Sequence, residues 1–178
     1  MFIGTNSKQN VRKWAWIWLA YTGFLFVDPI LDKPSPGKWF ATLTAFAIFL
    51  AIYATYVRSL DKGNRTRYLM IAAMFLLGLL TFPWNAGGST FFIYAAAFLP
   101  FSLKSIPRVL VLLGLESAAI LIEGYIFSTR GHFFYIAWPN VIFAVFLVLI
   151  IGGGNIIFAE QRRADVRLHR AQDEIEQL

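Results

Sequence analysis

Apolar residues fall into six long runs along the chain, separated by short segments that contain charges, proline or glycine. A helix needs about 20 predominantly apolar residues to cross the hydrocarbon core of a bilayer. Each run is close to that length, so the pattern predicts an all-α, polytopic membrane helical bundle of about six transmembrane helices. The predicted spans are residues 14–31, 39–57, 68–86, 89–106, 108–128 and 133–157.

The third and fourth predicted spans differ from the others because their purely apolar parts are short. Residues 82–88 between them contain one proline and two glycines, which is typical of a tight turn. We therefore expect one of these two segments either to re-enter the membrane from one side or to be buried inside the bundle.

The composition agrees with a membrane protein. Hydrophobic residues make up 58% of the 178 residues, and the mean hydropathy is +0.60. Soluble domains are usually about 45–50% apolar, so a lipid bilayer is the predicted surrounding of most of this chain. The absence of cysteine excludes disulfide bonds and thiol chemistry.

The distribution of basic residues predicts the orientation. With a cytoplasmic N-terminus, 13 of the 16 Lys and Arg residues lie in cytoplasmic segments. The positive-inside rule then favours cytoplasmic N- and C-termini and an even number of spans. Orientation accounts for the net charge of +6, so no nucleic-acid partner is predicted. No small-residue cleavage site follows the first apolar run, which we interpret as an uncleaved span.

The chain becomes polar after residue 157, and residues 158–178 contain neither glycine nor proline. Apolar or small residues recur there at alternating spacings of four and three, as at the a and d positions of a coiled coil. These positions are Ile157, Gln161, Ala164, Leu168, Ala171, Ile175 and Leu178. We predict a transmembrane sensor domain over 1–157 and a cytoplasmic coiled-coil signalling helix over 158–178, with homodimerisation through the coiled coil.

An alternative for this tail is an amphipathic helix on the membrane surface, with Arg162 and Arg163 at the headgroups. Four acidic residues in the tail disfavour an anionic surface, so the coiled coil is the preferred interpretation. The heptad pattern continues in register to Leu178, which suggests transmission to a segment further downstream.

Three consecutive glycines, Gly152, Gly153 and Gly154, lie near the cytoplasmic end of the sixth predicted span. They weaken a helix by about 1 kcal/mol each relative to alanine. They are candidates for a hinge that transmits movement to Leu168, Ala171, Ile175 and Leu178, or alternatively for close helix packing.

Two acidic residues, Glu116 and Glu123, lie inside the fifth predicted span and on one helix face, because they are seven residues apart. Ionisable residues at membrane depth indicate function by default. Three interpretations remain open: sensing, cation or proton transport, and a structural role in which the carboxylates bond to polar groups such as Asn140 or Asn155.

Asp28 and Pro29 end the first predicted span. Proline is expected to break the helix there, and Asp28 to cap it or to bind at the outer face. Both residues are further sensing candidates. The sequence contains no nucleophile–base set, no metal-ligand cluster and no nucleotide fingerprint, so no catalytic residue, metal or cofactor is predicted in this chain.

Three features of the chain belong together: residues 21–30 (YTGFLFVDPI), the short aromatic-rich spans, and residues 159–178 (AEQRRADVRLHRAQDEIEQL). In these features the chain resembles the membrane sensor region of DesK-type bacterial sensor histidine kinases. It implies a bacterial inner-membrane location, a parent kinase that uses ATP and Mg, and a response regulator as partner. It also implies that the spans respond to the membrane and that the coiled coil relays the signal.

The diagnostic kinase motifs of that family do not occur here. There is no Arg-Asp-Leu-His-Asp box, and His169 stands between Leu168 and Arg170. The expected function is therefore that of a sensor whose kinase core lies outside this chain. The alternative is a small proton- or cation-coupled transporter that uses Glu116 and Glu123.

Overall fold

The computed structural model describes residues 19–31, 35–59, 64–130 and 135–176. Every regular element in these segments is a helix, which confirms the predicted all-α class. The start of the first predicted span, residues 14–18, and Leu178 lie outside the described residues. The elements are the 3₁₀-helix η1 (Leu19–Phe26), α2 (Val27–Leu31), α3 (Pro36–Arg58), α4 (Asn64–Thr81), the short 3₁₀-helix η3 (Ala86–Gly88), α5 (Ser89–Ser102), α6 (Ile106–Arg130) and α7 (Trp138–Glu176).

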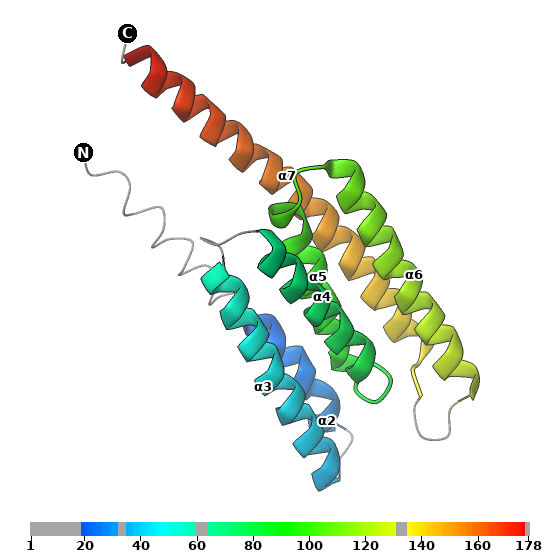
Figure 1. The fold of residues 1–178 in the computed structure, drawn as a ribbon. Coiled ribbons are helices and arrows are strands. Elements are labelled where there is room, and N and C mark those ends of the chain that lie inside the picture. Colours follow the sequence, from blue (N-terminus) through cyan, green and yellow to red (C-terminus); the bar gives the residue numbers. More distant parts are fainter. Residues whose placement is uncertain (1–18, 32–34, 60–63, 131–134, 177–178) are drawn as a thin grey trace.

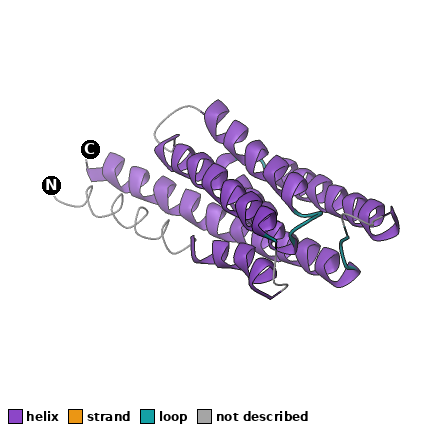
Figure 2. Ribbon diagram, turned by 90° about the horizontal axis from the view of Figure 1, so that it is seen from below, coloured by secondary structure: helices purple, strands orange, loops and turns teal. Residues whose placement is uncertain are grey.

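The helices form one bundle in which α5 is central (Figures 1 and 2). It packs mainly against α7 and α4, while α6 packs mainly against α7 and α3 against α4. Every residue of α5 from Thr90 to Ala97 is buried. The expectation that one of the two short segments is buried inside the bundle therefore holds for α5.

Among the described residues, three helices are long and apolar enough to cross a membrane, namely α3, α6 and α7. At 14 residues, α5 is only about 21 Å long, which is shorter than a hydrocarbon core of about 30 Å. The polar first turn of α4, which holds Arg65 and Arg67, lowers the hydropathy of that helix. The described helices follow the predicted apolar runs, and the number of spans beyond these three remains a prediction.

Aromatic rings fill the contact between α3 and α5. The Phe49 ring lies 4.7 Å from that of Tyr94 and 5.1 Å from that of Phe91, measured between centroids. Tyr56 stacks on Phe98 at 4.3 Å. Such ring pairs add specific geometry to apolar burial, and they hold the short helix α5 against a long helix.

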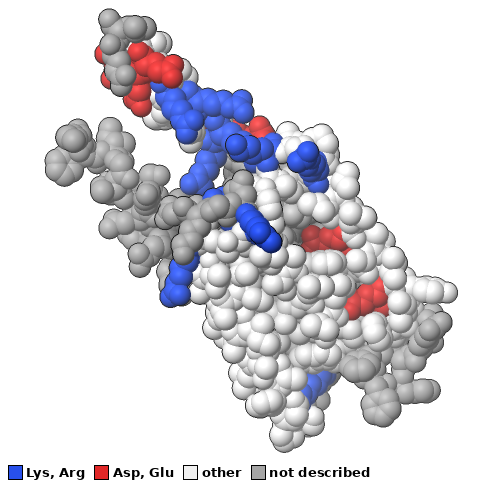
Figure 3. All heavy atoms as spheres, in the orientation of Figure 1, with Lys and Arg blue, Asp and Glu red and all other residues white. Residues whose placement is uncertain are grey.

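The outward faces of the long helices are apolar, with exposed side chains such as Phe40, Leu115 and Phe146. In Figure 3 most of the bundle surface is white, and Lys and Arg gather near the end from which the tail emerges. A large exposed apolar surface suits lipid rather than water, so the fold supports a membrane environment.

The last helix, α7, is continuous over 39 residues, about 58 Å, and leaves the bundle without a turn (Figure 1). It passes through the three glycines and through the predicted domain boundary at residue 157 with no interruption. Its N-terminal half packs on α5 and α6, whereas the residues after Arg163 are exposed up to Glu176.

Candidate functional site

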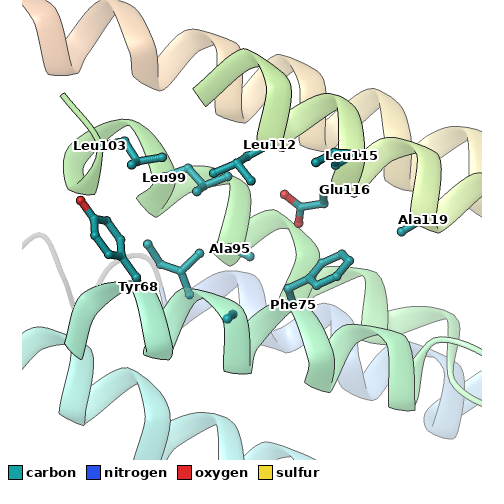
Figure 4. Close-up of a pocket in the computed structure, with 11 residues that line it drawn as sticks. Tyr68, Phe75, Ala95, Leu99, Leu103, Leu112, Leu115, Glu116 and Ala119 are labelled. Atoms are coloured by element: carbon teal, nitrogen blue, oxygen red, sulfur yellow. The ribbon is translucent and has the colours of Figure 1, made fainter. Parts of the chain in front are cut away.

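A cavity of about 500 Å³ lies between α4, α5 and α6, and the Glu116 carboxylate points into it (Figure 4). It exists because α4 packs mainly on α5 and α6 packs mainly on α7, so α4 and α6 have few direct contacts. Its walls are Tyr68, Ile71, Ala72, Phe75, Ala95, Leu99, Leu103, Leu112, Leu115, Glu116 and Ala119. Apart from the Tyr68 hydroxyl and the Glu116 carboxylate, these side chains are apolar.

The buried carboxylates of α6 lack donors within the described residues. Glu116 is 5% exposed and Glu123 is 7% exposed. Oε1 of Glu116, Oε2 of Glu123 and Oγ of Ser117 have no hydrogen-bond partner there. A buried polar group without a partner is costly, so a hydrogen-bond donor that reaches either carboxylate oxygen would be stabilising.

The two asparagines proposed as structural hydrogen-bond donors to these carboxylates do not bond to them. Asn155 on α7 donates through Nδ2 to the backbone oxygen of Ala97 at 3.2 Å, which joins α7 to α5. Asn140 is exposed. The structural interpretation therefore loses both of its proposed partners.

The two carboxylates occupy different surroundings although they share a helix. Glu116 lines the cavity, whereas Glu123 does not. Beside Glu123, Gly124 meets α7: a Cβ there would lie 2.6 Å from Cγ2 of Val141. Glu123 is thus next to a tight helix–helix contact, and Glu116 is at an open cavity.

Asp28 joins the first helical segment to the α4–α5 connection. Its Oδ2 accepts a hydrogen bond from the Ala86 backbone N–H at 3.2 Å and lies 4.0 Å from Nζ of Lys38. The expectation that Pro29 breaks the helix is wrong, because the chain stays helical to Leu31. Pro29 lacks the N–H that would pair with the Leu25 oxygen four residues earlier, and that oxygen accepts a hydrogen bond from Asn85 Nδ2 instead.

Asn85 is a buried polar residue that the sequence analysis did not single out. Its Nδ2 donates to the Leu25 backbone oxygen at 3.0 Å and to Thr42 Oγ1 at 3.3 Å, and its Oδ1 accepts from Gly87 N–H at 2.9 Å. The proline and glycines of residues 82–88 indicated a tight turn, but they did not indicate that the Asn85 amide would bond to η1, to α3 and within the α4–α5 connection.

Of the three consecutive glycines, only Gly152 is in close contact with another helix. A Cβ at Gly152 would lie 2.5 Å from Cδ2 of Leu113 on α6, whereas Cβ atoms at Gly153 and Gly154 would meet nothing within 4 Å. Close packing therefore explains Gly152. The hinge role stays a prediction, and Gly153 and Gly154 are its best candidates.

Arg163 joins the base of the tail to the end of α5. Its Nη2 donates to the backbone oxygens of Pro100 at 2.6 Å and Leu103 at 2.5 Å, and its Nη1 donates to that of Lys104 at 3.4 Å. Arg163 also pairs with Glu160 one turn earlier on α7. A helix C-terminus leaves carbonyls unpaired and carries partial negative charge, so a guanidinium is stabilising there.

The heptad positions of the tail that the structure describes are solvent-exposed in a single chain. Leu168 is 58% exposed, Ile175 is 71% exposed, and Ala171 is also exposed. The tail is an extension of α7 and does not fold back on the bundle (Figure 1).

Comparison of the chain with protein-family models, curated protein sequences and solved structures gives no match.

Proposed function

We propose that this chain is the membrane-embedded sensor part of a two-component sensor histidine kinase, with α7 as its output element. The observation that carries the proposal is the unbroken course of α7 from Trp138, within the bundle, to Glu176. A rigid helix with one half inside the bundle passes any rotation or shift on to its exposed half.

The Arg163 contacts support this role for α7. They attach the base of the tail to the α5–α6 connection, which includes Leu103 and Lys104. Since α5 also packs along α7 inside the bundle, a displacement of α5 reaches the tail by two routes. The stimulus is then any condition that moves α5 and α6 relative to α7.

Bilayer thickness is a stimulus that suits this architecture. The helices α4 and α5 are shorter than α3, α6 and α7, and a mismatch between hydrophobic length and bilayer thickness is relieved by tilting or shifting helices. In the proposal both termini are cytoplasmic, the membrane is the bacterial inner membrane, and two chains pair through the tail. The parent kinase supplies ATP and Mg binding and the contact with a response regulator.

Disulfide crosslinking of the tail tests the proposal. The chain has no cysteine, so single substitutions Leu168→Cys, Ala171→Cys and Ile175→Cys introduce unique reporters at the heptad positions. Asp173→Cys, on the opposite face of the same helix, is the control. In liposomes of short-chain and long-chain lipids we expect the heptad positions to crosslink and their relative yields to change with thickness. Identical yields in both lipids would contradict thickness sensing, and preferential crosslinking of Asp173→Cys would contradict the coiled coil.

The unpartnered carboxylates of α6 favour a second candidate, a small proton- or cation-coupled transporter. In that case Glu116→Gln and Glu123→Gln should each abolish proton or cation flux into liposomes that contain the purified chain. Deletion of residues 164–178 should leave flux unchanged, because a transporter has no need of the exposed tail. The sensor proposal expects no flux in any of these proteins.

A further inference from the structure

We propose that the cavity between α4, α5 and α6 binds a lipophilic amine, whose ammonium group pairs with Glu116 and whose apolar body fills the rest of the cavity. Its volume of about 500 Å³ lies in the range of small-molecule sites, about 300–1,000 Å³. Binding at this site is separable from signalling, because it concerns one chain and does not involve the tail.

The polar groups of the cavity determine the ligand chemistry. The Tyr68 hydroxyl is already used, because it donates to the Ser102 backbone oxygen at 3.2 Å. Oε1 of Glu116 is buried without a partner, and the described residues form no ion pair with this carboxylate. The cavity therefore lacks a hydrogen-bond donor, and a cationic donor is better than a neutral one because charge-assisted hydrogen bonds are about twice as strong.

The walls of the cavity determine the rest of the ligand. Ile71, Phe75, Leu99 and Leu112 form an apolar surface, which favours hydrocarbon or aromatic groups over polar ones. The position of the opening indicates how the ligand enters. Ala72 on α4 and Leu115 on α6 line the cavity and are also exposed, so the cavity opens on the apolar side of the bundle. A ligand that partitions into lipid reaches it laterally.

The choice between an amine and a lipid acyl chain depends on Glu116. An acyl chain would fill the apolar walls and leave the carboxylate oxygen unpaired, with the desolvation cost that this entails. An amine with an apolar body satisfies both parts of the site at once. Figure 4 shows the carboxylate directed from α6 toward the space bounded by α4 and α5, where such a group would lie.

Fluorescence titration with a matched pair of probes tests this site. Dansylcadaverine carries a primary amine on a five-carbon chain, and N-pentyl dansylamide is its neutral counterpart without the amine. Both are titrated into the purified full chain in non-ionic detergent. We expect the wild-type chain to bind the amine about tenfold or more tightly than the neutral probe.

Two glutamate variants separate the site from general charge effects. Glu116→Gln should lower amine affinity to that of the neutral probe, whereas Glu123→Gln, on the same helix but outside the cavity, should keep the wild-type preference. Ala72→Phe adds bulk at the exposed edge of the cavity without touching the carboxylate, and it should weaken binding of both probes at least severalfold.

Three results would overturn the inference. They are equal affinity of the wild-type chain for both probes, as in a groove that holds only acyl chains or detergent; an amine preference that persists in Glu116→Gln; and a preference that Glu123→Gln removes as completely as Glu116→Gln. Circular dichroism and gel filtration of each variant confirm that it is folded.

Discussion

Single polar side chains join helices that are far apart in this chain. Arg163 contacts backbone oxygens about sixty positions earlier, and Asn85 contacts Leu25 sixty positions earlier. A buried or half-buried donor that serves several carbonyls contributes more than an exposed ion pair, because its loss leaves several acceptors without a partner. Predictions for these two side chains belong to this scale.

Arg163→Gln should lower the free energy of unfolding in detergent by about 1–3 kcal/mol, because it removes a charged donor from three backbone oxygens. Chemical denaturation followed by circular dichroism measures this change. The neighbouring exposed residue provides the control, since Arg162→Gln should change stability by no more than about 0.5 kcal/mol. Equal effects of the two substitutions would show that the contacts of Arg163 do not stabilise the protein.

Arg163→Gln should also reduce the dependence of the disulfide crosslinking yields on lipid thickness, because Arg163 attaches the base of the tail to the α5–α6 connection.

Asn85→Ala should lower the free energy of unfolding by about 1–3 kcal/mol, since it leaves the Leu25 oxygen and the Gly87 N–H unpaired in a buried place. Thermal unfolding measures the loss, and the matched control is Asn140→Ala at an exposed position. An unchanged melting temperature for Asn85→Ala would mean that the amide is not important for holding η1 and α3 to the α4–α5 connection.

At the scale of helices, the contact between α6 and α7 depends on small residues. Gly124 approaches Val141, and Gly152 approaches Leu113. The two contacts differ in how easily they adapt. A Cβ at Gly124 would lie 2.6 and 2.7 Å from the two methyl carbons of Val141 and 3.2 Å from its Cβ. Val141 has little rotamer freedom in a helix, whereas the end of the Leu113 side chain can move.

Gly124→Ala should therefore lower the free energy of unfolding by about 1–3 kcal/mol, because α6 and α7 must separate to admit the methyl group. Gly114→Ala on the same helix is the matched control: nothing lies within 4 Å of a Cβ there, and alanine is the better helix former. Gly114→Ala should be neutral or stabilising by up to about 1 kcal/mol. If both substitutions had the same effect on thermal unfolding, the close approach at Gly124 would be refuted.

At the scale of the whole molecule, a bundle with an apolar surface is joined to a long polar helical extension. Leu168 and Ile175 on this extension are exposed. An apolar stripe on a polar helix is typical of a coiled-coil surface. The contacts between different helices of the chain lie in the bundle.

Deletion of residues 164–178 keeps Arg163 and its contacts but removes most of the heptad positions. We expect the truncated chain to keep the helical content of the bundle and its thermal stability, and to be monomeric, whereas the proposal expects the full chain to be a dimer. Light scattering in detergent, corrected for bound detergent, measures the mass. A truncated chain that remains dimeric would place the dimer contact in the bundle and not in the tail.

Much of the helical architecture can be read from local pattern. The apolar runs predicted where helices lie, because long apolar segments in lipid must satisfy their backbone groups within each helix. The short third and fourth runs indicated that one of the two either re-enters the membrane or is buried, without indicating which, and the residues after Phe158 indicated a continuous helix, since neither glycine nor proline interrupts them. Local pattern was less reliable at Pro29, where the chain stays helical and the Leu25 oxygen that the missing N–H leaves unpaired accepts a hydrogen bond from Asn85.

The sequence by itself thus determined the class of the fold, the approximate course of its helices, and the unusual position of Glu116 and Glu123 inside an apolar helix. The tertiary structure alone decided which groups meet: it separates the surroundings of Glu116 from those of Glu123, seats Asn85 against η1 and α3, and brings Arg163 to the end of α5. The physical reason is the separation along the sequence over which each kind of interaction acts. Helix formation depends on neighbours within a few positions, whereas the contacts of Asn85 and Arg163 join residues about forty to sixty positions apart and exist only once the helices have packed.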